Sequence, residues 1–213
     1  TPLAHWHPAL LACALLLAGG EASAQAQTYQ LDPVHTRIVF AVDHAGFSQS
    51  LGTFSGATGT LVWDDGDWRG ATLDVTVPLD SLDLGDARWR KNVLDGTFLD
   101  AGRQPQARFV STRVEPGEPG KARVFGQLTL RGETREVALD VTLNALKRHP
   151  LTRRQTAGFS ATAELSRRDF GMDAWPNVVG DRVALRIEAE AVRATAAAAA
   201  TPTEDDDGRE EQR

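Results

Sequence analysis

The sequence predicts an all-β protein, an eight-stranded antiparallel up-and-down barrel with one short helix. Three observations support this fold class. Apolar residues recur at every second position in eight separate segments, which is the period of strands with one buried face. Short polar turns separate most of these segments, so neighbouring strands should run antiparallel. Closing eight such strands into a ring removes exposed sheet edges, although an open sandwich is the alternative.

The segment from residue 124 to 146 predicts a hairpin most clearly. Leu128 and Leu130 alternate with polar residues in its first half, and apolar residues again take every second position between Val137 and Leu143. A short polar connection, Gly132-Glu133-Thr134, separates the halves and contains a glycine that can adopt positive φ. We therefore expect one face of this hairpin to be buried and the other to be wet.

The remaining elements follow in order along the chain. We expect strands at residues 34–44, 54–63, 71–79, 107–114, 124–130, 137–146, 157–165 and 182–191. Glycines in the second of these strands predict a bend. From Asp86 to Leu94 the period changes, with Trp89 and Val93 four positions apart, which predicts one short amphipathic helix.

Two strands carry small residues on the faces expected to point inward. These are Ala157, Ala161 and Ala163 on one strand, and Gly56, Thr58 and Thr60 on the other. Small inward residues leave room for a ligand, as in lipocalin-type barrels, although they also let a barrel taper. A cavity is therefore expected, but side chains could also fill it.

Parity and position near the helix assign the candidate ligand-binding residues. They are Ile38, Phe40, Val42, His44, Phe54, Val75, Trp89, Phe98, Leu128, Leu130, Leu139, Val141, Phe159, Phe170, Trp175 and Ile187. Trp89, Phe98, Phe170 and Trp175 are expected near the mouth or on the helix side. His44 is either a satisfied core or rim histidine, or it meets the polar end of a ligand.

Motifs for catalysis are absent from the sequence. There is no GxSxG, phosphate-binding glycine loop, HExxH or CxxC. His35 and His44 lie on one predicted strand with opposite parity, so they cannot share a metal without residues from elsewhere in the chain. We expect no enzyme activity, no catalytic residue and no metal site.

The charge distribution argues against a nucleic-acid partner. The net charge is −6, but residues 201–213 hold six acidic and two basic residues, or −4, which leaves −2 for the remainder. A nearly neutral body offers no basic stripe for nucleic acid.

Both ends of the sequence differ from the body. An apolar run of about ten residues, Ala9 to Ala18, is too short to span a bilayer, and Ala22-Ser23-Ala24 follows it, so residues 1–24 are expected to be a signal peptide. A buried N-terminal helix is the alternative. Residues 195–213 are acidic and of low complexity, which predicts a disordered tail. The barrel domain is therefore expected at 25–194.

Several spaced motifs together resemble the YceI-like family. They are Asp32-Pro33-Val34-His35-Thr36, Phe40-Ala41-Val42-Asp43-His44 with Gly46, Leu128-Thr129-Leu130-Arg131-Gly132, and Asp169-Phe170-Gly171-Met172. The resemblance spans Tyr29 to Arg193. It implies a lipocalin-like barrel exported to the bacterial periplasm, whose apolar tunnel holds a polyisoprenoid such as a prenyl quinone or a polyprenyl phosphate.

The resemblance therefore implies a periplasmic carrier of a long-chain isoprenoid lipid. Two alternatives stand beside it: an accessory module that supplies or buffers quinone for a membrane cytochrome b561-type partner, and a lipid hydrolase or isomerase. No cofactor is expected apart from a bound isoprenoid lipid or quinone, and a homodimer is one expected assembly. The helix carries Trp89-Arg90-Lys91-Asn92-Val93 where family members often have Arg-Asp-x-His-Leu, so head-group specificity does not carry over.

Overall fold

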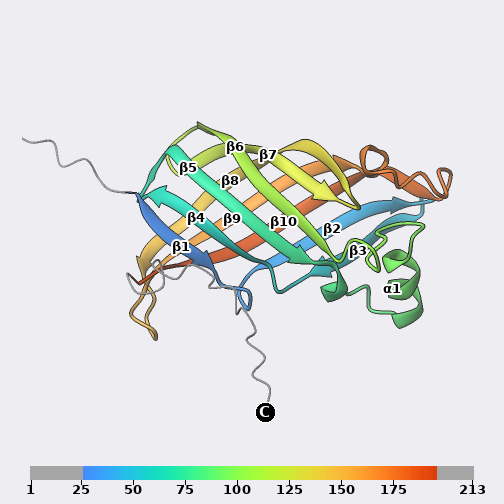
Figure 1. The fold of residues 1–213 in the computed structure, drawn as a ribbon, viewed down its shortest axis with the longest axis horizontal. Coiled ribbons are helices and arrows are strands. Elements are labelled where there is room, and N and C mark those ends of the chain that lie inside the picture. Colours follow the sequence, from blue (N-terminus) through green and yellow to red (C-terminus); the bar gives the residue numbers. More distant parts are fainter. Residues whose placement is uncertain (1–25, 196–213) are drawn as a thin grey trace, which may run out of the picture.

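Residues 26–195, the part of the chain that the computed structural model describes, form a closed antiparallel β-barrel with a single short α-helix (Figure 1). Eight strands make the ring in the order β1-β4-β5-β6-β7-β8-β9-β10, and β10 pairs again with β1. Two further strands, β2 and β3, extend the sheet from β10. The expected fold class is confirmed.

The elements have the following bounds. The strands are β1 (Gln27–Leu31), β2 (Arg37–His44), β3 (Ser48–Phe54), β4 (Thr58–Asp64), β5 (Asp67–Pro78), β6 (Gln106–Pro116), β7 (Lys121–Leu130), β8 (Glu133–Arg148), β9 (Gln155–Ser166) and β10 (Val179–Arg193). The helices are the 3-10 turns η1 (Leu79–Ser81) and η2 (Arg167–Phe170), and α1 (Ala87–Leu94).

The long strand β10 explains how ten strands fit an eight-stranded ring. One of its edges pairs with β9, while the other pairs first with β2 and then, from Ala191 to Arg193, with β1. Thus β1 and β2 follow one another along the same edge, and β4 and β3 follow one another outside them. Each pair occupies one position of the barrel.

The sequence pattern missed β1 and β3, and the expected strands at 34–44 and 54–63 correspond to β2 and β4 alone. β1 is too short to show a period. β3 turns Ser50, Gly52 and Phe54 toward the cavity side, so small and polar residues hide its alternation.

The segment that connects β3 to β4 also corrects the expected inward facing of the small residues at 56, 58 and 60. Gly56 has a φ of +67°, and across this connection the inward parity shifts by one residue. Ala57 and Leu61 are buried and line the barrel interior, whereas Thr58 is exposed. The two-residue period does not continue through Gly56, so the residues at 56, 58 and 60 were expected on the wrong face of the strand.

Two local predictions are confirmed. The hairpin between β7 and β8 is present, but its turn is Arg131 and Gly132 and not Gly132-Glu133-Thr134, because Glu133 and Thr134 already pair within β8. The φ values of Arg131 and Gly132, +57° and +81°, are those of a two-residue turn matched to strand twist. Helix α1 begins after Asp86, whose carboxylate accepts a hydrogen bond from the backbone N–H of Trp89 at 2.7 Å.

Aromatic side chains fill one end of the barrel. Trp63 is fully buried, and its ring centroid lies 5.4 Å from that of Trp68 and 5.8 Å from that of Phe159. Beside them the hydroxyl of Tyr29 donates to Asp65 at 2.5 Å. The opposite end carries α1 and the turn between β2 and β3 (Figure 1), and it is the end at which the interior opens.

The two terminal predictions lie outside the described residues. These are the signal peptide at 1–24 and, apart from Thr195, the acidic tail. Within residues 26–195 no helix is long and apolar enough to cross a bilayer.

Candidate ligand-binding cavity

The barrel interior holds two adjoining cavities. The outer chamber has a volume of about 550 Å³ and the inner chamber about 180 Å³. Ile38, Val77, Leu128 and Leu185 line both chambers, so these four side chains form a waist between them. Together the chambers make a space that runs from the helix end of the barrel toward the aromatic end.

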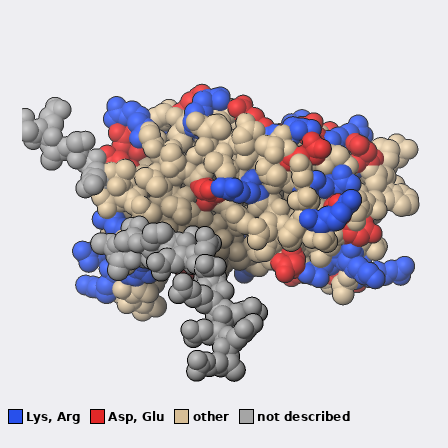
Figure 2. Space-filling model, viewed as in Figure 1, with Lys and Arg blue, Asp and Glu red and all other residues tan. Residues whose placement is uncertain are grey.

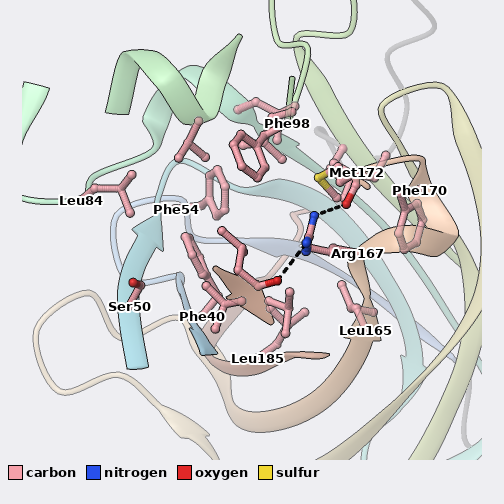
Figure 3. Close-up of a pocket in the computed structure, with 18 of the residues that line it drawn as sticks. Phe40, Ser50, Phe54, Leu84, Phe98, Leu165, Arg167, Phe170, Met172 and Leu185 are labelled. Carbon is pink, nitrogen blue, oxygen red and sulfur yellow. Dashed lines mark hydrogen bonds between the residues drawn. The ribbon is translucent and has the colours of Figure 1, made fainter. Parts of the chain in front are cut away.

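Apolar side chains from several elements line the outer chamber (Figure 3). Phe40 of β2 and Phe54 of β3 pack with ring centroids 5.7 Å apart. Phe40 needs the absence of a side chain at Gly52, since a Cβ there would lie 2.3 Å from the Phe40 ring. Residues of η1, α1 and η2 complete the wall, which explains why these short elements interrupt a β-protein.

The mouth of the outer chamber carries exposed aromatic residues. Trp89 of α1 and Trp175 of the loop before β10 line the chamber while remaining 39% and 63% exposed. Phe47 and Val178 are exposed nearby, and the N–H of Ala45 donates to the Val178 carbonyl at 2.7 Å. Figure 2 shows a patch of uncharged surface at the tip of this end, with charged side chains directly beside it.

The inner chamber is almost entirely apolar. Its polar lining residues are Thr36 and Thr72, and Trp68 and Phe159 close it toward the aromatic end. The hydroxyl of Thr36 and the indole N–H of Trp68 are buried without a hydrogen-bond partner among the described residues. Ala161 and Ala57, with other small residues, leave the volume open.

The structure brings all sixteen sequence-predicted site residues to this cavity, although their binding of a ligand stays a prediction. The outer chamber is lined by Ile38, Phe40, Val42, His44, Phe54, Trp89, Phe98, Leu128, Leu130, Phe170 and Trp175. The inner chamber is lined by Val75, Leu139, Val141, Phe159 and Ile187, together with Ile38 and Leu128. His44 lies at the exposed rim of the outer chamber, and its contact with the polar end of a ligand stays a prediction.

Sequence reasoning missed several lining residues. Leu79, Leu84 and Met172 lie in short helical or irregular segments where period two gives no information. Arg167 is different, because it continues the inward parity of Ala161, Ala163 and Leu165 and could have been found from that row. Arg167 was not among the candidates because a charged residue is not expected on the inward face of a strand.

Arg167 is the one buried cation among the described residues. It is only 3% exposed, and its guanidinium donates to the carbonyls of Gly180 at 2.9 Å and Val179 at 2.8 Å, and to that of Met172. Burial lowers the pKa of Arg167, and the neighbouring charge of Arg168 lowers it further. These bonds tie η2 to the start of β10 at the chamber wall.

A polar group on the outer surface lies apart from the cavity. Asp32, His35 and Glu190 bring potential metal-ligating atoms within 4.8 Å of one another. Both carboxylate oxygens of Asp32 already form hydrogen bonds. One accepts from the backbone N–H of Val34 at 2.9 Å, and the other lies 2.7 Å from Nδ1 of the His35 ring. This hydrogen bond with Asp32 raises the pKa of His35.

The fold and the cavity define a class: small antiparallel barrels with an apolar interior that opens at one end. The family model described as "YceI-like domain" matches residues 29–191. A UPF0312 protein of Serratia proteamaculans (strain 568) is 35% identical over 187 residues, covering 87% of this chain and 95% of that protein. The chain belongs to the YceI-like family.

Solved structures share the fold. The crystal structure of BcnA from Burkholderia cenocepacia matches with a TM-score of 0.68 and 22% identity, covering 75% of this chain and 98% of that one. A polyisoprenoid binding domain from Saccharophagus degradans, implicated in plant cell wall breakdown, matches with a TM-score of 0.56 and 13% identity over 79% of this chain and 99% of that one.

Proposed function

We propose that this protein is a periplasmic carrier that binds a long-chain isoprenoid in the two chambers of its barrel. The single observation that carries the proposal is the apolar space of two adjoining chambers, with its charged lining residues at one end only. The structural likeness to a protein described as a polyisoprenoid binding domain supports the choice of ligand class.

The distribution of polar groups supports a tail-first orientation. The charged residues along the cavity, Asp43, Asp95 and Arg167, all line the outer chamber, whereas the inner chamber has none. An isoprenoid tail gains roughly 25 cal/mol for each Å² of apolar area removed from water. The tail therefore fits the inner chamber and the waist, and the head group faces the mouth.

Binding, rather than chemistry on the ligand, is the function that these groups support. The Arg167 guanidinium donates to three backbone carbonyls, and Asp43 accepts the N–H of Gly46 at 3.0 Å. His44 and Ser50 also line the outer chamber, but no side-chain hydrogen bond among the described residues joins either of them to Asp43 or Arg167. Transport through the periplasm and delivery of quinone to a membrane cytochrome b561-type partner are two uses of the same binding site.

Native mass spectrometry of the full chain, expressed with residues 1–24 in place and purified from the periplasmic fraction, tests the proposal. We expect a bound species that organic extraction identifies as a prenyl lipid at about one per protein. After removal of the bound lipid, the protein should bind added prenyl ligands, and its affinity should rise with the length of the prenyl chain. Protein absent from the periplasmic fraction would contradict the location, and folded protein that takes up no prenyl compound would contradict the function.

A further inference from the structure

The wall of the outer chamber contains a cation whose charge is not neutralised. Arg167 is 3% exposed and begins η2, at the end of the inward row of β9. Figure 3 shows its guanidinium pointing away from η2 into the space bordered by Phe40, Met172 and Leu185. Burial of a cation this deep beside a mostly apolar cavity costs free energy unless hydrogen bonds or an opposite charge compensate for the lost water.

Its hydrogen bonds account for only part of its capacity. A guanidinium has five N–H groups. Three hydrogen bonds are formed, one each to the carbonyls of Gly180, Met172 and Val179. One N–H on each terminal nitrogen therefore remains available. All three acceptors are neutral, so they satisfy hydrogen bonds without neutralising the charge.

No carboxylate among the described residues forms an ion pair with Arg167. Asp181 is the carboxylate whose charge acts most strongly on Arg167. It accepts the Ser166 hydroxyl at 2.9 Å, however, and pairs with Arg168 at 3.8 Å. Asp43 and Asp95 line the same chamber, but Asp43 accepts the N–H of Gly46, and Asp95 is exposed at the rim. The lowered pKa of Arg167 agrees with a cation that lacks a contacting anion.

We propose that Arg167 binds the anionic head group of the ligand, a phosphate or diphosphate, and so selects prenyl phosphates over prenols and prenyl quinones with the same tail. This inference rests on the proposed function. The remaining N–H groups lie on the two terminal nitrogens, which is the arrangement that binds two phosphate oxygens at once. Away from bulk water, attraction between the two charges is strong.

The position of Arg167 also agrees with the length of the ligand. Arg167 lines only the outer chamber, while the waist and the inner chamber lie beyond it. A phosphate at Arg167 would leave the attached tail free to continue through the waist. The buried cation and the apolar space would then recognise the two ends of one molecule.

Tail-matched ligands test the inference on the full chain after removal of bound lipid. The quantities to measure, by tryptophan fluorescence, are the affinities of geranylgeranyl phosphate, geranylgeraniol, a quinone with the same tail, and inorganic phosphate. We expect wild-type protein to prefer the phosphate ester over the alcohol by at least about tenfold, as charge-assisted hydrogen bonds imply. Arg167→Met should remove this preference while still binding the alcohol.

Arg168→Met is the matched control. It removes the same charge from the next residue, which lies on the surface and does not line the cavity, so the preference should remain. If Arg167→Met fails to fold, Arg167→Lys provides the second variant, because it keeps the charge but loses the paired donors. It should reduce the preference without abolishing it.

Each contrary result has a distinct meaning. Equal binding of phosphate, alcohol and a quinone of the same tail by wild-type protein would overturn the role of Arg167 and leave the proposed function intact. Binding of inorganic phosphate as tightly as the prenyl phosphate would overturn it too, because the free ion would then be the ligand. Absence of binding by every prenyl compound would overturn the proposed function itself.

Discussion

Replacement of Ala161 by tryptophan should close the inner chamber. Ala161 lies on β9, is 8% exposed and pairs with Val141 and Ile187, and all three residues line that chamber. The new indole would occupy the space into which the end of a ligand tail extends. Short ligands held in the outer chamber should be unaffected.

The volume of the inner chamber sets the magnitude. About 180 Å³ corresponds to roughly six groups the size of a water molecule at ~30 Å³ each, or about one isoprene unit. Excluding its five carbons costs up to about 4 kcal/mol at ~0.8 kcal/mol per buried CH₂. Because ordering of the tail offsets part of this, we expect a loss of about 2–4 kcal/mol, or roughly 30- to 1,000-fold in affinity.

The assay compares the affinities of geranyl and geranylgeranyl ligands that carry the same head group. Ala161→Trp should weaken binding of the longer ligand selectively, while overpacking lowers the stability by about 1–3 kcal/mol. Ala138→Trp is the matched control, because Ala138 lies on β8 with the opposite parity and lines neither chamber. A folded Ala161→Trp protein with undiminished affinity for the longer ligand would refute the tail-first orientation.

Three further predictions concern stability and titration. Burial raises the pKa of Tyr29 to about 12; the unfolded phenol ionises near pH ~10, so stability should be full below that pH and fall by about 2–3 kcal/mol as pH rises to ~12. Tyr29 is the sole tyrosine, so tyrosinate absorbance reports it directly, and ionisation of the folded protein near pH ~10 would contradict the prediction. The raised pKa of His35 means that its hydrogen bond with Asp32 stabilises the protein below pH ~6.5 and loses effect as pH rises through the raised value. In Asp32→Asn the NMR titration of His35 should move back toward ~6.5, and an unchanged curve would exclude Asp32 as the cause. Gly126→Ala would place a Cβ 2.4 Å from the Phe109 ring and 2.6 Å from the backbone oxygen of Val110; urea unfolding should show a loss of about 1–3 kcal/mol, and an unaltered midpoint would contradict this steric reasoning.

Strand positions were predictable where alternation was long and uninterrupted. The segments that became β5 to β10 each show enough inward apolar positions for the period to be recognised, and short turns join β6, β7, β8 and β9. Seven of the sixteen candidate residues came from these segments, and four aromatic residues came from the neighbourhood of the predicted helix or mouth. The other five, Ile38, Phe40, Val42, His44 and Phe54, came from the expected strands at 34–44 and 54–63. Their placement along one cavity follows because a barrel has only one interior.

The strand predictions failed where the position of a residue in the barrel does not follow from the alternation of its neighbours in sequence. β1 has five residues and is held in place by pairing with both β4 and β10, which are distant in sequence. Gly56 reversed the parity of the following strand through a single positive φ. Neither event leaves a periodic trace in the sequence.

The sequence by itself determined an antiparallel barrel, its one helix, the inward face of most strands and the family to which the chain belongs. Only the tertiary structure decided that the interior is open, that it is divided at a waist, and that Arg167 lies on its wall. The physical reason is that parity specifies the face on which a side chain lies. Whether that face is filled, empty or charged depends on the volumes and hydrogen bonds of all the strands that meet there.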